Sequence, residues 1–121
     1  MRAREAERQR LLAMRTEKGR LERASKLAGK VLVQVGTPEL IIAAVSSYNV
    51  VIDATAQRIL HGCRDFQREA RAGRLCKHVA AVLLDIEVSL ALPILRTLAE
   101  DEGYWELDMI APRVGASRAP R

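Results

Sequence analysis

The stretch that decides the fold runs from residue 61 to residue 78 and reads His61-Gly62-Cys63, twelve further residues, and then Cys76-Lys77-His78. Each end holds two metal-binding residue types with one residue between them. Imidazole nitrogen and thiolate sulfur are ligands that zinc prefers, and four of them complete a tetrahedral site. The pattern therefore predicts one structural zinc ion, bound by His61, Cys63, Cys76 and His78, with no position left open for water or substrate.

The alternative is a small domain that happens to contain two buried cysteines and two unrelated histidines, since free cysteine is often buried. Three features favour zinc. Gly62 allows a close backbone approach, so both members of the first pair can turn toward one ion. Cys76 lies where an apolar helix is expected to begin, and a helix N-terminus stabilises a thiolate. The four residues are also every histidine and cysteine of the chain.

These residues resemble a SWIM zinc finger, whose pattern is Cys-x-Cys, a spacer and Cys-x-His, preceded by short strands and followed by an apolar helix. Arg64-Asp65-Phe66 is similar to the Pro-Asp-Phe that follows the second ligand in that family, and Cys76-Lys77-His78 is similar to its Cys-Lys-His. The resemblance covers residues 31–86 and is most specific over 48–84. His61 stands where the family has cysteine, which implies a site with two nitrogen and two sulfur ligands.

The N-terminal segment, residues 2–28, predicts one long helix, because it is rich in Arg, Glu, Leu and Ala. Gly19 weakens its middle and Gly29 marks its end. The segment is basic, with ten Lys or Arg against four Glu through residue 30. Its thin apolar stripe needs cover, since isolated helices are marginal in water. The body of the chain, a partner or a second copy would supply that cover, and a homodimer through this helix is one hypothesis. The stripe consists of Leu11, Met14, Leu21 and Ala28, and Leu12 beside it needs cover as well.

The segment 30–60 predicts an antiparallel meander, because short runs rich in Val and Ile alternate with turn residues. In the run YNVVID, alternation places Tyr48, Val50 and Ile52 on one apolar face. Residues 77–92 predict an apolar helix, which Pro93 either kinks or ends before a second helix. Residues 104–110 would form a final strand, and 111–121 a disordered tail.

The predicted fold class is α+β, with an N-terminal helix, a small antiparallel sheet, a zinc finger and C-terminal helices. Its parts are a basic N-terminal helix over 1–29, the zinc-finger domain with its C-terminal helices over 30–110, and the tail over 111–121. A chain of 121 residues fits one domain. Domains this small bury a smaller fraction of their surface than large ones, so a metal would contribute usefully to stability.

Composition narrows the setting of the protein. Two cysteines are too few for a typical disulfide-framed secreted domain, and the first ten residues, MRAREAERQR, lack the apolar core of a signal peptide. The apolar run over 79–95 is broken by Asp85, Glu87 and Pro93, so it is too polar to span a bilayer. We therefore expect an intracellular protein of the cytoplasm, the nucleoid or the nucleus.

No catalytic set or phosphate loop stands out in the sequence, so we expect no enzymatic activity. Asp65 and Glu69 are the one carboxylate pair near the finger. The simplest interpretation is that they form surface ion pairs with a neighbouring arginine, namely Arg64, Arg68 or Arg71.

The resemblance implies two functions, since SWIM domains are described as protein-interaction or DNA-binding modules. This short chain is similar to the small SWIM subunits that accompany recombinase paralogues in homologous recombination. We therefore expect an adaptor in DNA repair whose partner is a RecA-family recombinase or paralogue. The alternative is a direct DNA-binding regulator. Its net charge of +5, its N-terminal helix and the basic residues of the finger would neutralise phosphates. The finger residues are Arg64, Arg68, Arg71, Arg74 and Lys77.

Overall fold

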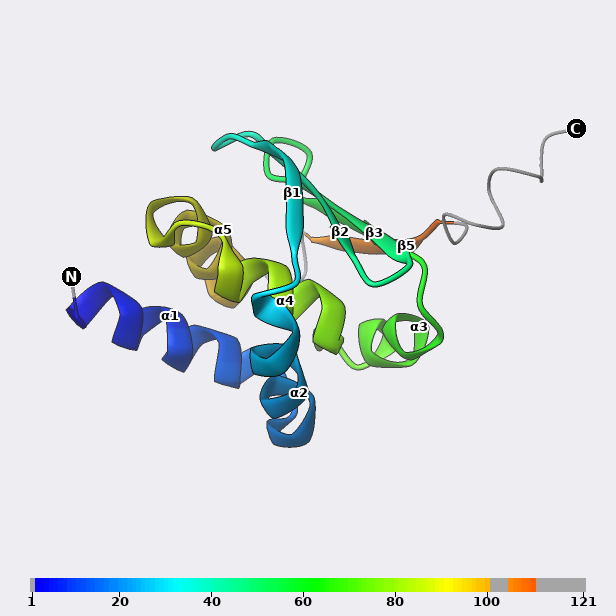
Figure 1. Ribbon diagram of the computed structural model, residues 1–121, viewed down its shortest axis with the longest axis horizontal. Coiled ribbons are helices and arrows are strands. Elements are labelled where there is room, and N and C mark those ends of the chain that lie inside the picture. The colour runs from blue at the N-terminus through cyan, green and yellow to red at the C-terminus, as the bar shows by residue number, and fades with distance from the viewer. Residues whose placement is uncertain (1, 101–104, 111–121) are drawn as a thin grey trace, which may run out of the picture.

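The computed structural model describes residues 2–100 and 105–110. Helices α1 (Arg2–Arg15) and α2 (Lys18–Ala28) precede four strands, β1 (Leu32–Gly36), β2 (Leu40–Val45), β3 (Tyr48–Asp53) and β4 (Arg58–His61). Three helices follow, α3 (Arg64–Arg71), α4 (Lys77–Asp85) and α5 (Val88–Glu100), and the last element is β5 (Glu106–Met109). The predicted α+β class is confirmed (Figure 1). Within the described residues, no helix is long and apolar enough to cross a membrane.

The five strands form one sheet in the order β1-β2-β3-β4-β5. Strands β1 to β4 are the predicted antiparallel meander. Strand β5 confirms the expected final strand but pairs parallel to β4, because the helices α3 to α5 form the crossover between them. The sheet is therefore mixed. Tyr104 and the predicted tail, 111–121, lie outside the described residues.

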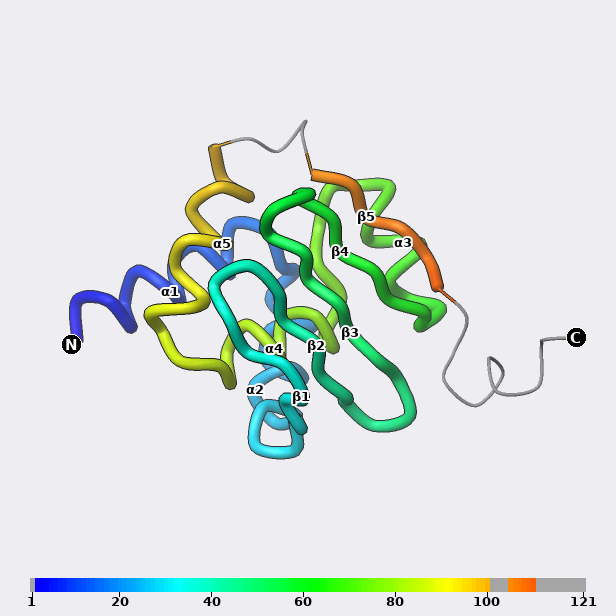
Figure 2. The backbone as a smooth tube through the Cα atoms, turned by 90° about the horizontal axis from the view of Figure 1, so that it is seen from above, coloured from blue at the N-terminus to red at the C-terminus, as the bar shows by residue number. Residues whose placement is uncertain are grey.

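One face of the sheet forms the core with the helices. Ile41, Ile52 and Ile59 lie opposite one another on adjacent strands and are fully buried. Helix α4 packs against β2 and β3, while α2 packs on α4 and α1 packs on α5. In YNVVID, Val50 and Ile52 are buried and Tyr48 is half-buried beside them, as the alternation predicted. Figure 2 looks onto the opposite face of the sheet, with α2 and α4 behind the strands.

The prediction of a single helix over 2–28 is wrong, because the chain breaks between α1 and α2 at Thr16-Glu17. The carbonyl of Arg15 accepts a hydrogen bond from the amide of Leu75, at 2.7 Å. The Arg15 guanidinium donates to the carbonyl of Gly73, at 2.8 Å, and to the carbonyl of Leu98. The helix therefore breaks where the segment before Cys76 binds it. Gly19 lies inside α2, whereas Gly29 ends that helix as predicted.

The apolar stripe of the N-terminal helices is covered mainly by the body of the same chain. Leu11 and Leu12 are buried in the common core, and Leu21 is partly buried against it. Met14 is the exception, because 60% of it is exposed. Cover for the stripe therefore does not require a second copy, and homodimerisation through this helix stays a prediction.

The predicted helix boundary at Pro93 is also wrong. Helix α4 ends at Asp85, Ile86 is extended with ψ 162°, and Pro93 lies inside α5. The cause is again a contact from the N-terminal helix. The buried Arg8 donates from Nη1 to the carbonyl of Leu83, at 3.1 Å, and to that of Ile86, at 2.5 Å. These bonds satisfy carbonyls at the end of α4, where a cation is also favoured by the helix dipole.

We expect Arg8→Met to lower the free energy of unfolding by about 1–3 kcal/mol, because buried carbonyls of α4 lose a charged donor. Urea denaturation measures the change. The matched control is Arg10→Met, which removes the same charge from an exposed position of the same helix. It should change stability by no more than about 0.5 kcal/mol. Equal losses in the two variants would contradict the capping role of Arg8.

Candidate metal centre

The four predicted ligands meet where one strand ends and two helices begin. His61 is the last residue of β4, and Cys63 is the N-cap residue of α3. Cys76 is the N-cap residue of α4, and His78 lies in the first turn of that helix. One ligand atom from each of the four side chains lies within 4.8 Å of all the others. The structure therefore brings together all four residues of the predicted set.

The two cysteines lie at the positive ends of two helix dipoles, which favour negative charge on sulfur. The Cys63 Sγ accepts a hydrogen bond from the amide of Phe66, at 3.2 Å. A hydrogen bond from the Cys76 thiol holds the pKa of Cys63 far below its ordinary value, and His61 and His78 add to that effect. Burial raises the pKa of Cys76, and the Cys63 sulfur raises it further. The protein alone therefore favours one thiolate, and a bound dication would supply the charge needed for two.

The orientation of His61 is fixed by the strand next to its own. Its Nδ1 donates to the carbonyl of Asn49, at 2.7 Å, and this bond selects the tautomer whose Nε2 is a free acceptor. That Nε2 lies 3.3 Å from the Nδ1 of His78. Metal-binding histidines commonly donate a hydrogen bond from the ring nitrogen that does not bind the metal, as His61 does to Asn49. Such a bond sets the ring orientation and raises the basicity of the ligand.

Two aromatic rings wall off the cluster. The ring of Tyr48 lies 5.5 Å from that of His61 and 5.0 Å from that of His78. The ring of Phe66 meets His61 edge-on, at 5.3 Å and 88°. All four ligands are buried, and the most exposed of them, His78, is only 6% exposed. Sequence reasoning had placed Tyr48 on an apolar face and Phe66 in a family pattern, but it had given neither residue a place beside the metal.

The cluster fits one structural zinc ion. Tetrahedral zinc with bonds of about 2.0–2.3 Å holds its ligand atoms about 3.3–3.8 Å apart. The four ligand atoms here lie within 4.8 Å of one another, and the two imidazole nitrogens are 3.3 Å apart, so a small contraction of the cluster would suit the ion. Two sulfur and two nitrogen donors suit zinc, and histidine is an ordinary zinc ligand at the position where the resembling family has cysteine. Four protein ligands and the burial of all of them leave no open coordination position. A zinc ion bound by all four residues would therefore have a structural role.

Helix α3 is fixed to the N-terminal helices by Arg20. The Arg20 guanidinium donates twice to the carboxylate of Asp65, at 2.7 Å each, and lies 3.6 Å from a buried carboxylate oxygen of Glu69. Glu69 also accepts from Arg74, at 3.1 Å. The interpretation that Asp65 and Glu69 form surface pairs with Arg64, Arg68 or Arg71 is therefore wrong. No local signal in the sequence distinguishes Arg20 from the other basic residues of its segment.

The five residues predicted to bind nucleic acid are divided among α3, the loop after it and the start of α4. Arg64, Arg68 and Arg71 are exposed along α3. Arg74 is paired with Glu69. Lys77 is half-buried at the start of α4, and it lines a groove with residues of α2. Nucleic-acid binding by this set stays a prediction.

Comparison with known proteins agrees with the geometry. A SWIM zinc finger family model matches residues 62–87. That segment contains Cys63, Cys76 and His78, and His61 lies one residue before it. No curated protein and no solved structure matched the chain. The match and the four-residue cluster together define a zinc-binding module of SWIM type within this chain.

We expect metal analysis of the purified protein to find about one zinc per chain, with loss of zinc in Cys76→Ser because one of four ligands is removed. Structural zinc contributes on the order of 10–16 kcal/mol in finger peptides, so chelation should abolish the cooperative unfolding transition. His61→Cys should keep the metal, because thiolate also binds zinc. Gln67→Ala, an exposed change on α3, is the control. A fully folded protein without zinc would contradict this assignment.

We expect Arg20→Met to lower the free energy of unfolding at pH 7 by about 2–4 kcal/mol, because it leaves the partly buried Asp65 and the buried Glu69 with fewer partners. The hydrogen bonds from Arg20 hold the pKa of Asp65 below its usual value. That contribution is present above the unfolded-state pKa of about 3.9 and is lost as the pH falls through the folded-state pKa. Denaturation curves should therefore show wild type and variant converging below about pH 4. A pH-independent difference would contradict the ion pair as its cause.

Proposed function

We propose that this protein is a zinc-stabilised adaptor that binds a partner protein through the face of its sheet that no described helix covers. The observation that carries the proposal is a row of branched apolar side chains on that face. Val35 lies opposite Ile42, Ile42 lies opposite Val51, and Val51 lies opposite Leu60 in the strand register. We call these four residues the open-face row.

The open-face row differs from what a solvated sheet face normally carries. Antiparallel sheets that have one face toward water usually carry polar residues there. Here the row crosses four strands, and each of its members remains partly accessible. Figure 2 shows this face, with β1 at one edge of the sheet and β5 at the other. Contiguous apolar surface of this kind marks interaction sites more often than it is left in water.

A charged pair lies beside one end of the open-face row, and an exposed leucine lies beside the other end. Leu60 lies opposite Asp108 of β5, and Asp108 accepts a hydrogen bond from Arg58 at 3.0 Å. At the other end, Leu32 of the edge strand is 65% exposed. An apolar centre with a charged rim is the usual composition of protein–protein interfaces.

The proposed partner is a RecA-family recombinase or paralogue, and the proposed process is DNA repair by homologous recombination. The SWIM match over 62–87 supports the zinc-binding module of this proposal. The choice of a recombinase as partner rests only on the resemblance of this short chain to small SWIM subunits that accompany recombinase paralogues. The zinc ion would maintain the shape of the module, and the sheet face would supply the contact.

Direct DNA binding by α3 is the second candidate function. Arg64, Arg68 and Arg71 are exposed and form no ion pair within the described part of the chain. Free arginines along one helix are suited to phosphate contacts.

We expect the double variant Val51→Asp, Leu60→Asp to weaken binding to a purified RecA-family recombinase or paralogue by at least about a hundredfold. Two buried carboxylates in an apolar interface would cost more than about 2.7 kcal/mol together. Titration calorimetry measures the affinity, and zinc content shows that the fold persists. Met14→Asp, which places one aspartate on an exposed apolar residue of α1, should bind as wild type. Full affinity in the double variant would contradict docking through the sheet.

A further inference from the structure

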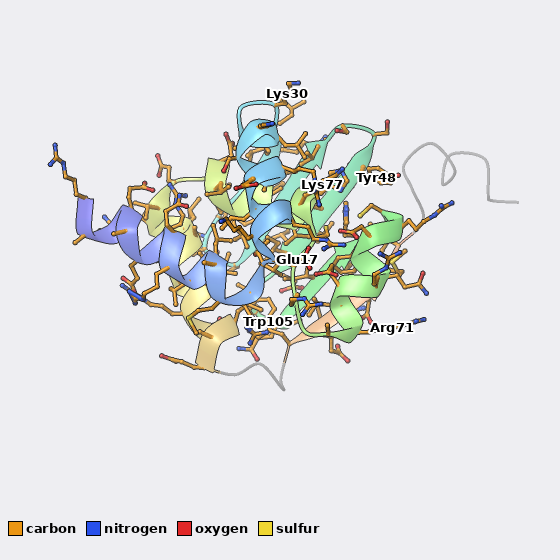
Figure 3. All side chains as sticks on the ribbon, turned by 90° about the horizontal axis from the view of Figure 1, so that it is seen from below. Glu17, Lys30, Tyr48, Arg71, Lys77 and Trp105 are labelled. Carbon is orange, nitrogen blue, oxygen red and sulfur yellow. The ribbon has the colours of Figure 1, made fainter. Side chains whose placement is uncertain are left out.

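On the helical side of the molecule, α2 and α4 enclose a groove that the zinc site does not use. The groove has a volume of about 230 Å³. Its lining consists of four cationic side chains around one leucine, namely Arg23, Lys26, Lys30 and Lys77 around Leu27. Figure 3 views the molecule from this side and labels Lys30 and Lys77. We call this feature the α2–α4 groove.

The sequence places these cations together in two ways. Arg23, Lys26 and Lys30 follow the spacing i, i+3 and i+7, which keeps residues on one side of a helix and of the turn that continues it. Lys77 lies between Cys76 and His78, so the metal centre fixes its backbone. Because α2 packs on α4, the helical stripe lies beside this lysine.

The four cations have no neutralising partner in the described residues. None of them forms an ion pair or a hydrogen bond with a side chain there. Arg20 of the same helix differs, because it binds Asp65 and Glu17. The one acidic residue of α2, Glu22, does not line the groove. Four like charges around one concavity create a positive potential that an anion would relieve.

We propose that the α2–α4 groove binds the phosphate backbone of duplex nucleic acid. The groove is open and contains no buried polar side chain that would enclose a single anion, so a chain of anions suits it better than one. Arg23 and Lys26 are separated by about 4.5 Å along the helix axis, so the cations are spread along the groove and can contact more than one phosphate. Leu27 and the alkyl stems of the lysines offer apolar surface to the sugars.

The lining also favours a duplex over a single strand. Proteins that bind single strands stack successive bases on aromatic rings. None of the groove's lining residues is aromatic. Contacts limited to phosphates and sugars position a duplex without reading its sequence. The expected binding is therefore independent of sequence and strongly dependent on salt.

The groove is distinct from both surfaces of the proposed function. The open-face row lies on the other side of the sheet, and the arginines of α3 lie on a different helix. Lys77 belongs to the finger residues predicted to bind nucleic acid, and Arg23 and Lys26 belong to the basic N-terminal segment that the same hypothesis named. Duplex binding at the groove thus builds on the second candidate function and places its contact there instead of on α3. Binding at the groove therefore does not depend on docking through the sheet, and each can fail without the other.

The test compares two triple variants of the full zinc-loaded chain for binding to a fluorescent duplex oligonucleotide over a range of salt concentrations. Arg23→Gln/Lys26→Gln/Lys30→Gln should weaken binding by at least about tenfold and reduce the slope of log K against log salt by about two to three. Arg64→Gln/Arg68→Gln/Arg71→Gln removes the same net charge from α3 and should lose less than about threefold. Lys77 is left unchanged because it adjoins two ligands. Zinc content and urea denaturation check that both variants are folded.

Several results would overturn the proposal. These are equal losses in the two variants, a larger loss in the α3 variant, and no measurable binding of the duplex by wild type. Tighter binding of a single-stranded oligonucleotide would also overturn it, as would competition by a polyglutamate peptide as effective as competition by unlabelled duplex. Recombinase binding by the Arg23, Lys26 and Lys30 variant should match that of wild type, which separates this test from that of the adaptor role.

Discussion

The N-termini of α3 and α4 and the end of β4 must meet at one buried point, where their four side chains can bind a single ion. The rest of the structure depends on this constraint. Two helix dipoles bring positive potential to this point, and two cysteine sulfurs bring the compensating negative charge. His61 closes the cluster from the sheet, held by its bond to Asn49. A zinc ion there connects β4, α3 and α4, which would otherwise share a modest apolar core. The ion also ties together the two ends of the segment 64–75, which contains α3.

The N-terminal helices stabilise this arrangement through three arginines. Arg15 donates to the carbonyls of Gly73, which precedes α4, and of Leu98 in α5. Arg20 binds the carboxylate of Asp65 on α3. Arg8 satisfies the carbonyls at the end of α4. A segment that is merely basic in composition therefore contributes specific long-range hydrogen bonds. Its apolar residues Leu11 and Leu12 complete the same core. Among the basic residues of this segment that form no ion pair in the described part of the chain, Arg23 and Lys26 lie on α2 and line the α2–α4 groove.

The sequence was sufficient where structure follows from local pattern. Ligand types and spacing identified the metal cluster, and alternation in YNVVID identified the buried face of β3. It was insufficient where distant contacts decide. The helix breaks at Thr16-Glu17 and at Ile86 contain no glycine or proline that could have signalled them. They lie where Arg15 and Arg8 make hydrogen bonds to residues far away in the sequence. Helix α3 was not assigned, since its cap is a metal-binding cysteine and its one large apolar residue is Phe66.

Leu60 and His61 are consecutive residues of the short strand β4, and this gives the metal a further role. Neighbouring residues of a strand face opposite sides of the sheet, so Leu60 belongs to the open-face row while His61 points to the core. A slip of β4 by one residue would exchange the two sides and put an imidazole among the apolar side chains of the outer face. Coordination of His61 penalises that slip by the full strength of a metal bond. The ion thereby fixes the register of β4, a strand of only four residues, against its neighbours in the sheet.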